Sequence, residues 1–189
     1  MLGGWQARRV SPWRTLIGTI LSARSRDEMT DRISAELFRR YGTPRALARA
    51  DRRSVERILK PIGFYRTKAR YIMETARRVG KRGVPRTLEG LMEFPGVGRK
   101  VANCVLVYAF GKQAIPVDTH VHRVSNRMGW VRTRHPDETE RELVRIVPRR
   151  LWPAVNEALV AHGKGTCRPI GPKCDDCPVR RWCRRVGVR

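Results

Sequence analysis

A lysine behind a glycine-rich turn is the first feature of this sequence that could do chemistry. The run FPGVGRK at 94–100 places Gly96 and Gly98 just before Lys100, at the start of a predicted helix. Glycines let another molecule approach the backbone closely, and a helix N-terminus favours an anion such as a phosphate. The helix dipole disfavours a cation there, so the Lys100 amine is a candidate nucleophile. The alternatives are a plain packing turn and an ordinary solvated lysine.

A carboxylate that could assist this amine lies eighteen residues later, in Val117-Asp118-Thr119-His120. The predicted helix and loop between the two can return the chain toward Lys100. Asp118 could then accept a proton or stabilise a developing cation. The alternative is that Asp118 caps the next helix, and one carboxylate can fill both roles. His120 and His122 point to different faces of a helix, which argues against a paired metal site.

The cysteines indicate a metal centre near the C-terminus. Cys167, Cys174, Cys177 and Cys183 crowd into the last 23 residues, whereas Cys104 stands in an apolar stretch and is predicted to be a core residue. An odd total of five argues against a disulfide framework. One CxxC with two outlying cysteines permits either zinc or an iron–sulfur cluster. Basic residues surround this cluster and favour contacts with a nucleic-acid backbone; they include Lys164, Arg168 and Lys173.

The composition agrees with a polyanionic partner. The 189 residues carry a net charge of +24, and 34 of the 41 basic residues are arginines, whose guanidinium groups match phosphate oxygens. An apolar content of 41% excludes a disordered chain. Residues 1–10 contain no apolar signal region, and no apolar run is long enough to cross a bilayer. We therefore expect an intracellular protein (cytoplasm or nucleoid) that is neither secreted nor membrane-bound.

Helical periodicity runs through almost the whole chain, and no segment alternates convincingly like a strand. Caps and apolar stripes predict helices at 13–21, 27–41, 65–79, 85–94, 99–110, 119–128, 136–146 and 151–162. Shorter helices are predicted after Thr43 and after Asp51. The helix at 99–110 is apolar on most of its circumference, so we expect it at the centre of the core.

These motifs together resemble the endonuclease III family of helix-hairpin-helix DNA glycosylases, over residues 11–183. The run at 94–100 is similar to the family's hairpin ending in its catalytic lysine. Residues 117–120 resemble its catalytic aspartate motif, and the four clustered cysteines have its iron–sulfur spacing.

The resemblance implies an all-α, two-lobed fold. One lobe would comprise residues 11–112, with the hairpin at about 88–110. The other would comprise 1–10 and 113–189, with a 4Fe–4S cluster loop at 167–183. DNA would bind in a cleft between the lobes, with Lys100 and Asp118 at its mouth, and the family expectation is a monomer.

The implied activity is base-excision repair of double-stranded DNA with damaged bases or abasic sites. The enzyme would flip out oxidised pyrimidines. Lys100 would displace the base, form a Schiff base and cleave the abasic site by β-elimination, supported by Asp118. Two alternatives stay open: a mismatch glycosylase that removes T or U opposite G, and a non-enzymatic DNA-binding module.

The resemblance also implies a set of DNA contacts, comprising Gly96, Val97, Gly98, Arg99 and His120. Backbone carbonyls near Met92, Phe94 and Val97 would hold an alkali cation that ties the hairpin to a phosphate. Arg24 stands where the family commonly has a Gln that enters the gap left by the flipped base. Phe64 falls at the second wedge position, with an ordinary core aromatic as the alternative.

Overall fold

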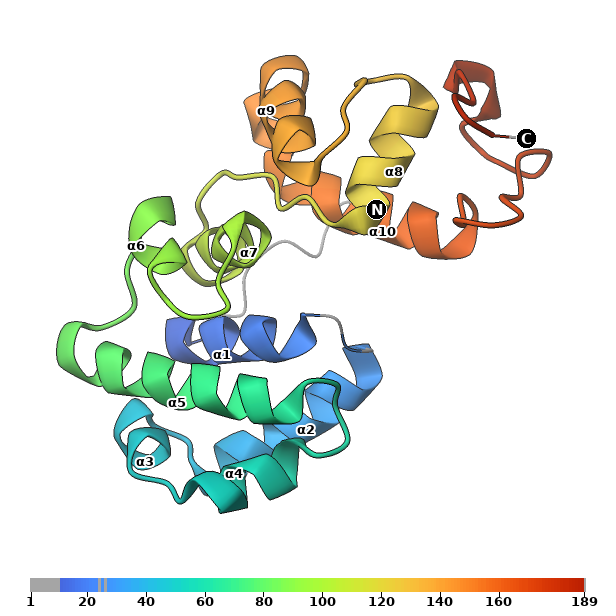
Figure 1. Ribbon diagram of the computed structural model, residues 1–189. Coiled ribbons are helices and arrows are strands. Elements are labelled where there is room, and N and C mark those ends of the chain that lie inside the picture. Colours follow the sequence, from blue (N-terminus) through green and yellow to red (C-terminus); the bar gives the residue numbers. More distant parts are fainter. Residues whose placement is uncertain (1–10, 24, 26, 189) are drawn as a thin grey trace. The chain divides into compact units, whose positions relative to one another are not determined.

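The computed structural model describes residues 11–23, 25 and 27–188. These residues form helices and irregular segments without a strand, which confirms the all-α prediction. They divide into two compact units, one ending at Lys112 and the other beginning at Gln113 (Figure 1). In the described part of the chain, no helix is both long enough and apolar enough to span a membrane. The predicted placement of residues 1–10 and the predicted contact of Arg24 lie outside the described residues.

The first unit contains helices α1 to α7. Their bounds are α1 (Pro12–Ser22), α2 (Asp27–Arg40), α3 (Pro44–Ala48), α4 (Arg52–Leu59), α5 (Tyr65–Arg82), α6 (Leu88–Met92) and α7 (Arg99–Phe110). Side-chain caps explain several starts, as when Asp51 accepts a 2.8 Å hydrogen bond from the Ser54 N–H.

Several predicted helices differ by a few residues from the observed ones, and two of these differences have a clear local cause. The helix predicted at 85–94 is only the short α6, because the Thr87 side chain caps it by accepting from the Gly90 N–H. Helix α5 continues beyond the predicted end at Val79 to Arg82. It stops at Gly83, whose φ of 73° is the left-handed conformation that commonly ends helices.

Helix α7 lies in the core of the first unit, as its sequence predicted. Every residue from Val101 to Val107 is buried, Cys104 included. Apolar side chains from α1, α5 and the hairpin complete this core, among them Leu16, Ile72 and Phe94. Burial on all sides fixes α7 in place, so the two residues at its start, Arg99 and Lys100, are carried on a rigid element.

The second unit contains α8 (Thr119–Met128), α9 (Pro136–Ile146) and α10 (Trp152–Gly165), with short 3-10 turns at Arg149–Leu151 and Arg180–Trp182. Its core is built from aliphatic residues such as Val121, Leu143 and Leu159. Gly163 allows α10 to approach α8 closely, since a Cβ there would lie 2.9 Å from His120 Nδ1. The chain beyond α10 is irregular and carries the four clustered cysteines.

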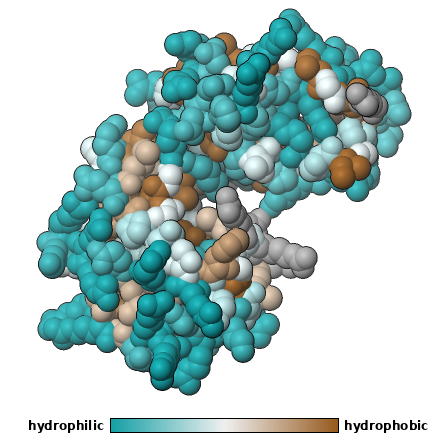
Figure 2. Space-filling view, viewed as in Figure 1, coloured by the Kyte–Doolittle hydropathy of each residue, from teal (hydrophilic) through white to brown (hydrophobic). Residues whose placement is uncertain are grey.

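The surface of both units is predominantly hydrophilic in the view of Figure 2, with apolar residues scattered over it. The large apolar side chains that are exposed include Phe64, Trp130, Ile146, Ile170 and Trp182. A hydrophilic surface on a chain of charge +24 is consistent with a partner that is recognised through phosphates.

Candidate functional site

The hairpin between α6 and α7 is a tight turn held from beneath by apolar side chains. Leu91, Phe94 and Val97 are buried in the core of the first unit. Gly96 has a φ of 77°, and a Cβ added to it would lie 2.4 Å from Cδ2 of Tyr71. Glycine is therefore required at 96 both by its backbone conformation and by the tyrosine against which it packs.

The start of α7 has no side-chain cap, as is also true of α1, α5 and α10. The N-cap of α7 is Gly98, and no acidic residue stands in its first turn. A Cβ at Gly98 would meet open space, so this glycine is not explained by the surrounding protein. Arg99 and Lys100 follow directly and are half-buried. An uncapped helix start next to two cationic side chains is suited to an anion.

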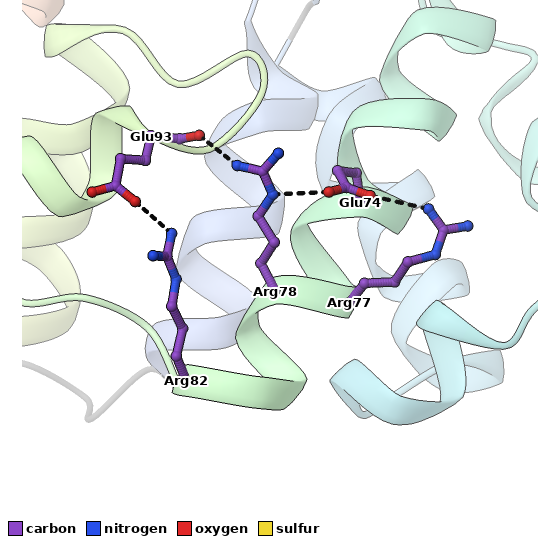
Figure 3. Close-up of polar contacts among 5 residues, drawn as sticks. All are labelled: Glu74, Arg77, Arg78, Arg82 and Glu93. Atoms are coloured by element: carbon purple, nitrogen blue, oxygen red, sulfur yellow. Dashed lines mark hydrogen bonds and ion pairs between the residues drawn. The ribbon is translucent and has the colours of Figure 1, made fainter.

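Arginines of α5 fasten the hairpin to the rest of the first unit (Figure 3). Arg78 Nη1 donates to the Glu93 backbone carbonyl at 2.9 Å, and Arg82 Nη2 pairs with Glu93 Oε2 at 2.8 Å. Glu74 in turn accepts from Arg78 Nε at 2.8 Å and from Arg77 Nη1 at 3.1 Å. Its hydrogen bonds to Arg78 and then Arg77 lower the pKa of Glu74. The network orients Arg78 toward the hairpin backbone.

Asp118 caps α8, as its alternative role predicted. Its Oδ1 accepts from the His120 N–H at 2.9 Å and from the Val121 N–H at 2.8 Å. Both bonds use the same oxygen, so Oδ2 takes no part in the cap. The carboxylate is half-buried at a helix N-terminus. The cap therefore holds one carboxylate oxygen in place, and the other oxygen can still take part in a reaction.

Two arginines of α8, four residues apart, hold the chain that follows α10. Arg123 Nη2 donates to the Gly163 carbonyl at 2.9 Å and to the Cys167 carbonyl at 3.0 Å. Arg127 reaches further along, with Nη1 bonded to the Arg168 carbonyl at 2.5 Å. The same Nη1 lies 3.6 Å from Cys167 Sγ. Sequence reasoning missed both arginines, although their i, i+4 spacing on a predicted helix puts them on one face.

The four clustered cysteines line one pocket in the second unit, and each is half-buried. Within the described residues, no three His, Cys, Asp or Glu side chains form a group that could hold a single metal ion. The donor set is nevertheless purely thiol, with a backbone N–H directed at one sulfur and a histidine nitrogen near another. Arg185 N lies 3.4 Å from Cys183 Sγ, and His162 Nε2 lies 3.8 Å from Cys177 Sγ. Hydrogen bonds to thiolates are typical surroundings of iron–sulfur clusters, so the residues fit such a group.

A polar network joins α8 to α9 beneath the surface. His122 Nδ1 lies 2.7 Å from Thr139 Oγ1, which lies 2.6 Å from Thr133 Oγ1. Asn126 completes it through bonds to the His122 carbonyl and to Thr133. Burial lowers the pKa of His122, and the nearby charge of His135 lowers it further. Burial, with the charge of His135, therefore favours a neutral imidazole at this position.

Of the remaining predicted contacts, Phe64, Lys164, Arg168 and Lys173 are exposed, whereas His120 is half-buried. Phe64 is 62% exposed, which rules out the alternative of a core aromatic. It is also one of two non-glycine residues with positive φ in the described part of the chain, the other being Arg185. An exposed aromatic side chain on a strained backbone is more typical of a functional position than of a packing one. Lys164, Arg168 and Lys173 are exposed around the cysteine pocket.

A separate apolar pocket lies on the second unit and contains none of the predicted site residues. Trp130, Ile146, Leu151 and Ala158 contribute to its lining. None of the nine residues that line it is titratable. It therefore lacks the groups needed for nucleophilic or acid–base chemistry.

Comparison with known proteins identifies relatives over most of the chain. A family described as "HhH-GPD superfamily base excision DNA repair protein" matches residues 17–149. Endonuclease III of Thermotoga maritima is 46% identical over 179 residues, which cover 93% of this chain and 84% of that protein.

Solved structures of DNA glycosylases are also similar to this chain over most of its length. A trapped covalent intermediate of endonuclease III with DNA, an estranged-adenine complex, has a TM-score of 0.88 and 36% identity, covering 95% of this chain and 86% of that one. A thermostable thymine-DNA glycosylase has a TM-score of 0.81 and 27% identity, covering 96% of this chain and 86% of that one.

Proposed function

Because the chain belongs to the HhH-GPD superfamily of base excision DNA repair proteins and is a homologue of endonuclease III, we propose that it is a bifunctional glycosylase for oxidised pyrimidines. Base excision repair by a glycosylase follows from the family itself, which confirms the prediction made from the motifs. The same membership argues against a non-enzymatic DNA-binding module. The substrate and the residue roles below are proposals.

The observation that carries the proposal is the position of Lys100 in the first turn of α7, behind the uncapped Gly98. The Lys100 amine attacks C1′ of the damaged nucleotide. The N–C1′ bond forms as the glycosidic bond breaks, and the base leaves. Asp118 takes up the proton that the amine loses and stabilises the cationic sugar, through the oxygen that does not cap α8. The C1′–O4′ bond then breaks, so that the sugar ring opens, O4′ takes up a proton and the C1′=N double bond of the Schiff base forms. The Schiff base loses a C2′ proton, and the C3′–O bond breaks, which nicks the strand.

The hairpin supplies the principal contact with the DNA backbone. A phosphate at the start of α7 would accept from backbone N–H groups, and the open space at Gly98 lets it approach. Gly96, Val97 and Arg99 complete this contact in the proposal. The Phe94 carbonyl accepts from the Val97 N–H at 3.1 Å and keeps a second lone pair, so it can still join Met92 and Val97 in binding an alkali cation.

The second unit adds positive charge. His120, Lys164, Arg168 and Lys173 are proposed to contact phosphates, which positions the protein without reading sequence. We propose that residues 11–112 and 113–189 act as two lobes of one monomer, both in contact with the duplex.

Two residues of the first unit are proposed to replace the flipped nucleotide. Arg24 would enter the gap and donate to the orphaned base. Phe64 would stack in the duplex as a wedge, which its exposure and strained backbone support.

The proposed cofactor is a 4Fe–4S cluster held by Cys167, Cys174, Cys177 and Cys183. Bound iron would supply four Fe–thiolate bonds that crosslink the loop after α10. This role is supported by the all-thiol pocket and by the arginine contacts around it. Iron content and visible absorption test it: Cys174→Ser should lose iron, whereas Cys104→Ala, outside the pocket, should retain it. Zinc in place of iron would overturn the assignment.

A second candidate substrate is T or U opposite G. The likeness to a thymine-DNA glycosylase, with a TM-score of 0.81, is the observation that favours it. Duplexes carrying thymine glycol or a G·T mismatch, incubated under single-turnover conditions, separate the two. Faster release of thymine than of thymine glycol would replace the first proposal.

The lyase is tested by borohydride trapping on an abasic-site duplex. Wild-type protein should give a covalent protein–DNA band, and Lys100→Ala should give none. Lys60→Ala is the matched control, because Lys60 is an exposed lysine of the same unit that caps α4 through its backbone alone. Trapping that survives in Lys100→Ala would remove this residue from the mechanism. No trapping with iron-loaded wild-type protein would remove the lyase and favour the mismatch glycosylase.

A further inference from the structure

A buried lysine that takes no part in the proposed chemistry lies at the start of α5. Lys68 is 5% exposed, and burial lowers its pKa. Its Nζ donates to the Leu21 carbonyl at 2.8 Å and to Ser25 Oγ at 2.6 Å. Lysines are almost never buried unless their ammonium group is paired, so this one needs an explanation.

The two partners of Lys68 Nζ lie on either side of the exit from α1. Leu21 is in the last turn of that helix, where carbonyls lack intrahelical partners and the dipole favours a cation. Helix α1 has no basic residue of its own in this turn. Ser25 lies beyond the helix, and its N–H closes a turn onto the Ser22 carbonyl at 3.0 Å. One ammonium group thus fixes both ends of the connection that leads from α1 into α2.

The backbone of the same residue reaches the second proposed DNA-inserting element. The Lys68 N–H donates to the Phe64 carbonyl at 2.9 Å, which begins α5. Phe64 is the exposed aromatic with a φ of 58°. The side chain of Lys68 therefore holds the connection between α1 and α2, and its backbone N–H holds Phe64, the residue that precedes α5.

A lysine is not the only side chain that could fill this space. A methionine would avoid the cost of burying a charge, but the Leu21 carbonyl and the Ser25 hydroxyl would lose this donor. Nor would a methionine tie the turn after Leu21 to α5 in a single arrangement.

We propose that Lys68 is a positioning residue for DNA insertion, which holds the turn at 22–25 and the Phe64 backbone in register so that both enter a duplex together. The inference rests on the proposed function, in which positions 24 and 64 fill the space of the flipped nucleotide. In this proposal Lys68 does not contact DNA itself, but it determines how the inserted residues contact the orphaned base.

The test uses a duplex in which 2-aminopurine lies opposite a tetrahydrofuran abasic analogue, which cannot be cleaved. Fluorescence of 2-aminopurine reports the stacking of the orphaned base, and its titration gives the affinity. Lys68→Met should remain folded at the assay temperature, with a modestly lower melting temperature, but lose most of the fluorescence change at saturation. Affinity should fall about tenfold, as for loss of a hydrogen bond to a charged group. Lys60→Met, at an exposed lysine, should match the wild type in both measurements.

Ser25→Ala provides a variant with little risk of misfolding, since it removes one hydroxyl from a half-buried side chain. It should reproduce part of the loss in fluorescence amplitude with an unchanged melting temperature. Wild-type amplitude and affinity in both variants would overturn the proposal. A loss in Lys68→Met that merely tracks its unfolding, with Ser25→Ala unaffected, would also overturn it, because the role would then be structural. The analogue requires no chemistry, so a failure of the lyase proposal would appear in borohydride trapping and not here.

Discussion

Tyr71 of α5 packs directly against the bare Cα of Gly96, with its Cδ2 only 2.4 Å from where a Cβ would stand. This contact couples the longest helix of the first unit to the tip of the hairpin. Two glycines thus stand in the same turn for different reasons. Gly96 is required by its positive φ and by its contact with Tyr71. Gly98 has an ordinary φ and open space around its Cα, so no contact within the protein requires a glycine there.

Replacing each glycine by alanine should therefore affect a different property of the protein, namely stability for Gly96 and DNA binding for Gly98. Gly96→Ala should cost about 1–3 kcal/mol of stability, from the positive φ and the clash with Tyr71. Gly98→Ala should cost less than about 1 kcal/mol, yet weaken DNA binding because the methyl group occupies the proposed path of a phosphate. Thermal unfolding and fluorescence anisotropy with an abasic-analogue duplex measure the two effects. Equal affinity of Gly98→Ala and wild type would remove the phosphate from this turn.

Arg78 and Arg77 offer a second matched pair on one helix. Both lie within hydrogen-bond distance of Glu74, but only Arg78 also donates to the Glu93 carbonyl of the hairpin. Arg78→Gln should lower the affinity for duplex DNA about fivefold, because one hydrogen bond that fixes the hairpin backbone is lost. Arg77→Gln should stay within about twofold, as expected for an exposed ion pair. Each variant removes one positive charge, so a purely electrostatic effect would be equal in the two.

Retention of the proposed cluster should depend on Arg127. Its guanidinium contacts the Arg168 and Pro169 carbonyls and lies near Cys167 Sγ. Arg127→Gln should release iron to a chelator faster than wild type, because the cysteine loop loses these contacts. Iron release followed by visible absorption measures the rate. Arg150→Gln, which removes an exposed charge from the same unit, should behave as wild type. Equal rates in all three proteins would show that the loop needs no such support.

The sequence predicted features that depend on near neighbours and missed those that depend on distant ones. The cap at Asp118 and the central helix α7 follow from local patterns, and the structure has both. The helix predicted at 85–94 was placed too early at its start, because the cap formed by Thr87 was not anticipated. Lys68 pairs with residues 43 and 47 positions away, and Arg127 reaches a carbonyl 41 positions away. Nothing in the local pattern marks either side chain as different from other basic residues.

The neutral imidazole of His122 should make stability depend on pH. Its folded-state pKa lies below that of the unfolded chain, so the unfolded state binds the proton more readily. Stability from this group is fully present above about pH 6.5, the ordinary histidine value, and is lost as pH falls through the lowered folded pKa. Thermal melts between pH 7.5 and 5.5 should show a smaller decrease for His122→Asn than for wild type. An identical decrease would assign the pH dependence elsewhere, since burial also lowers the pKa of His162.

The two roles of Asp118 can be separated by its two oxygens. Oδ1 accepts both capping hydrogen bonds, and an asparagine oxygen can accept them as well. Asp118→Asn should therefore keep the stability of α8, while the loss of the charge abolishes proton transfer. Asp118→Ala should lose the cap and about 0.5–2 kcal/mol of stability in addition. If both variants trap abasic DNA as wild type does and differ only in thermal melts, Asp118 is a cap alone. If Asp118→Asn melts like wild type but releases base at least about a hundredfold more slowly, the effect lies in the range typical of acid–base groups. The carboxylate would then act in the reaction while its other oxygen holds the helix.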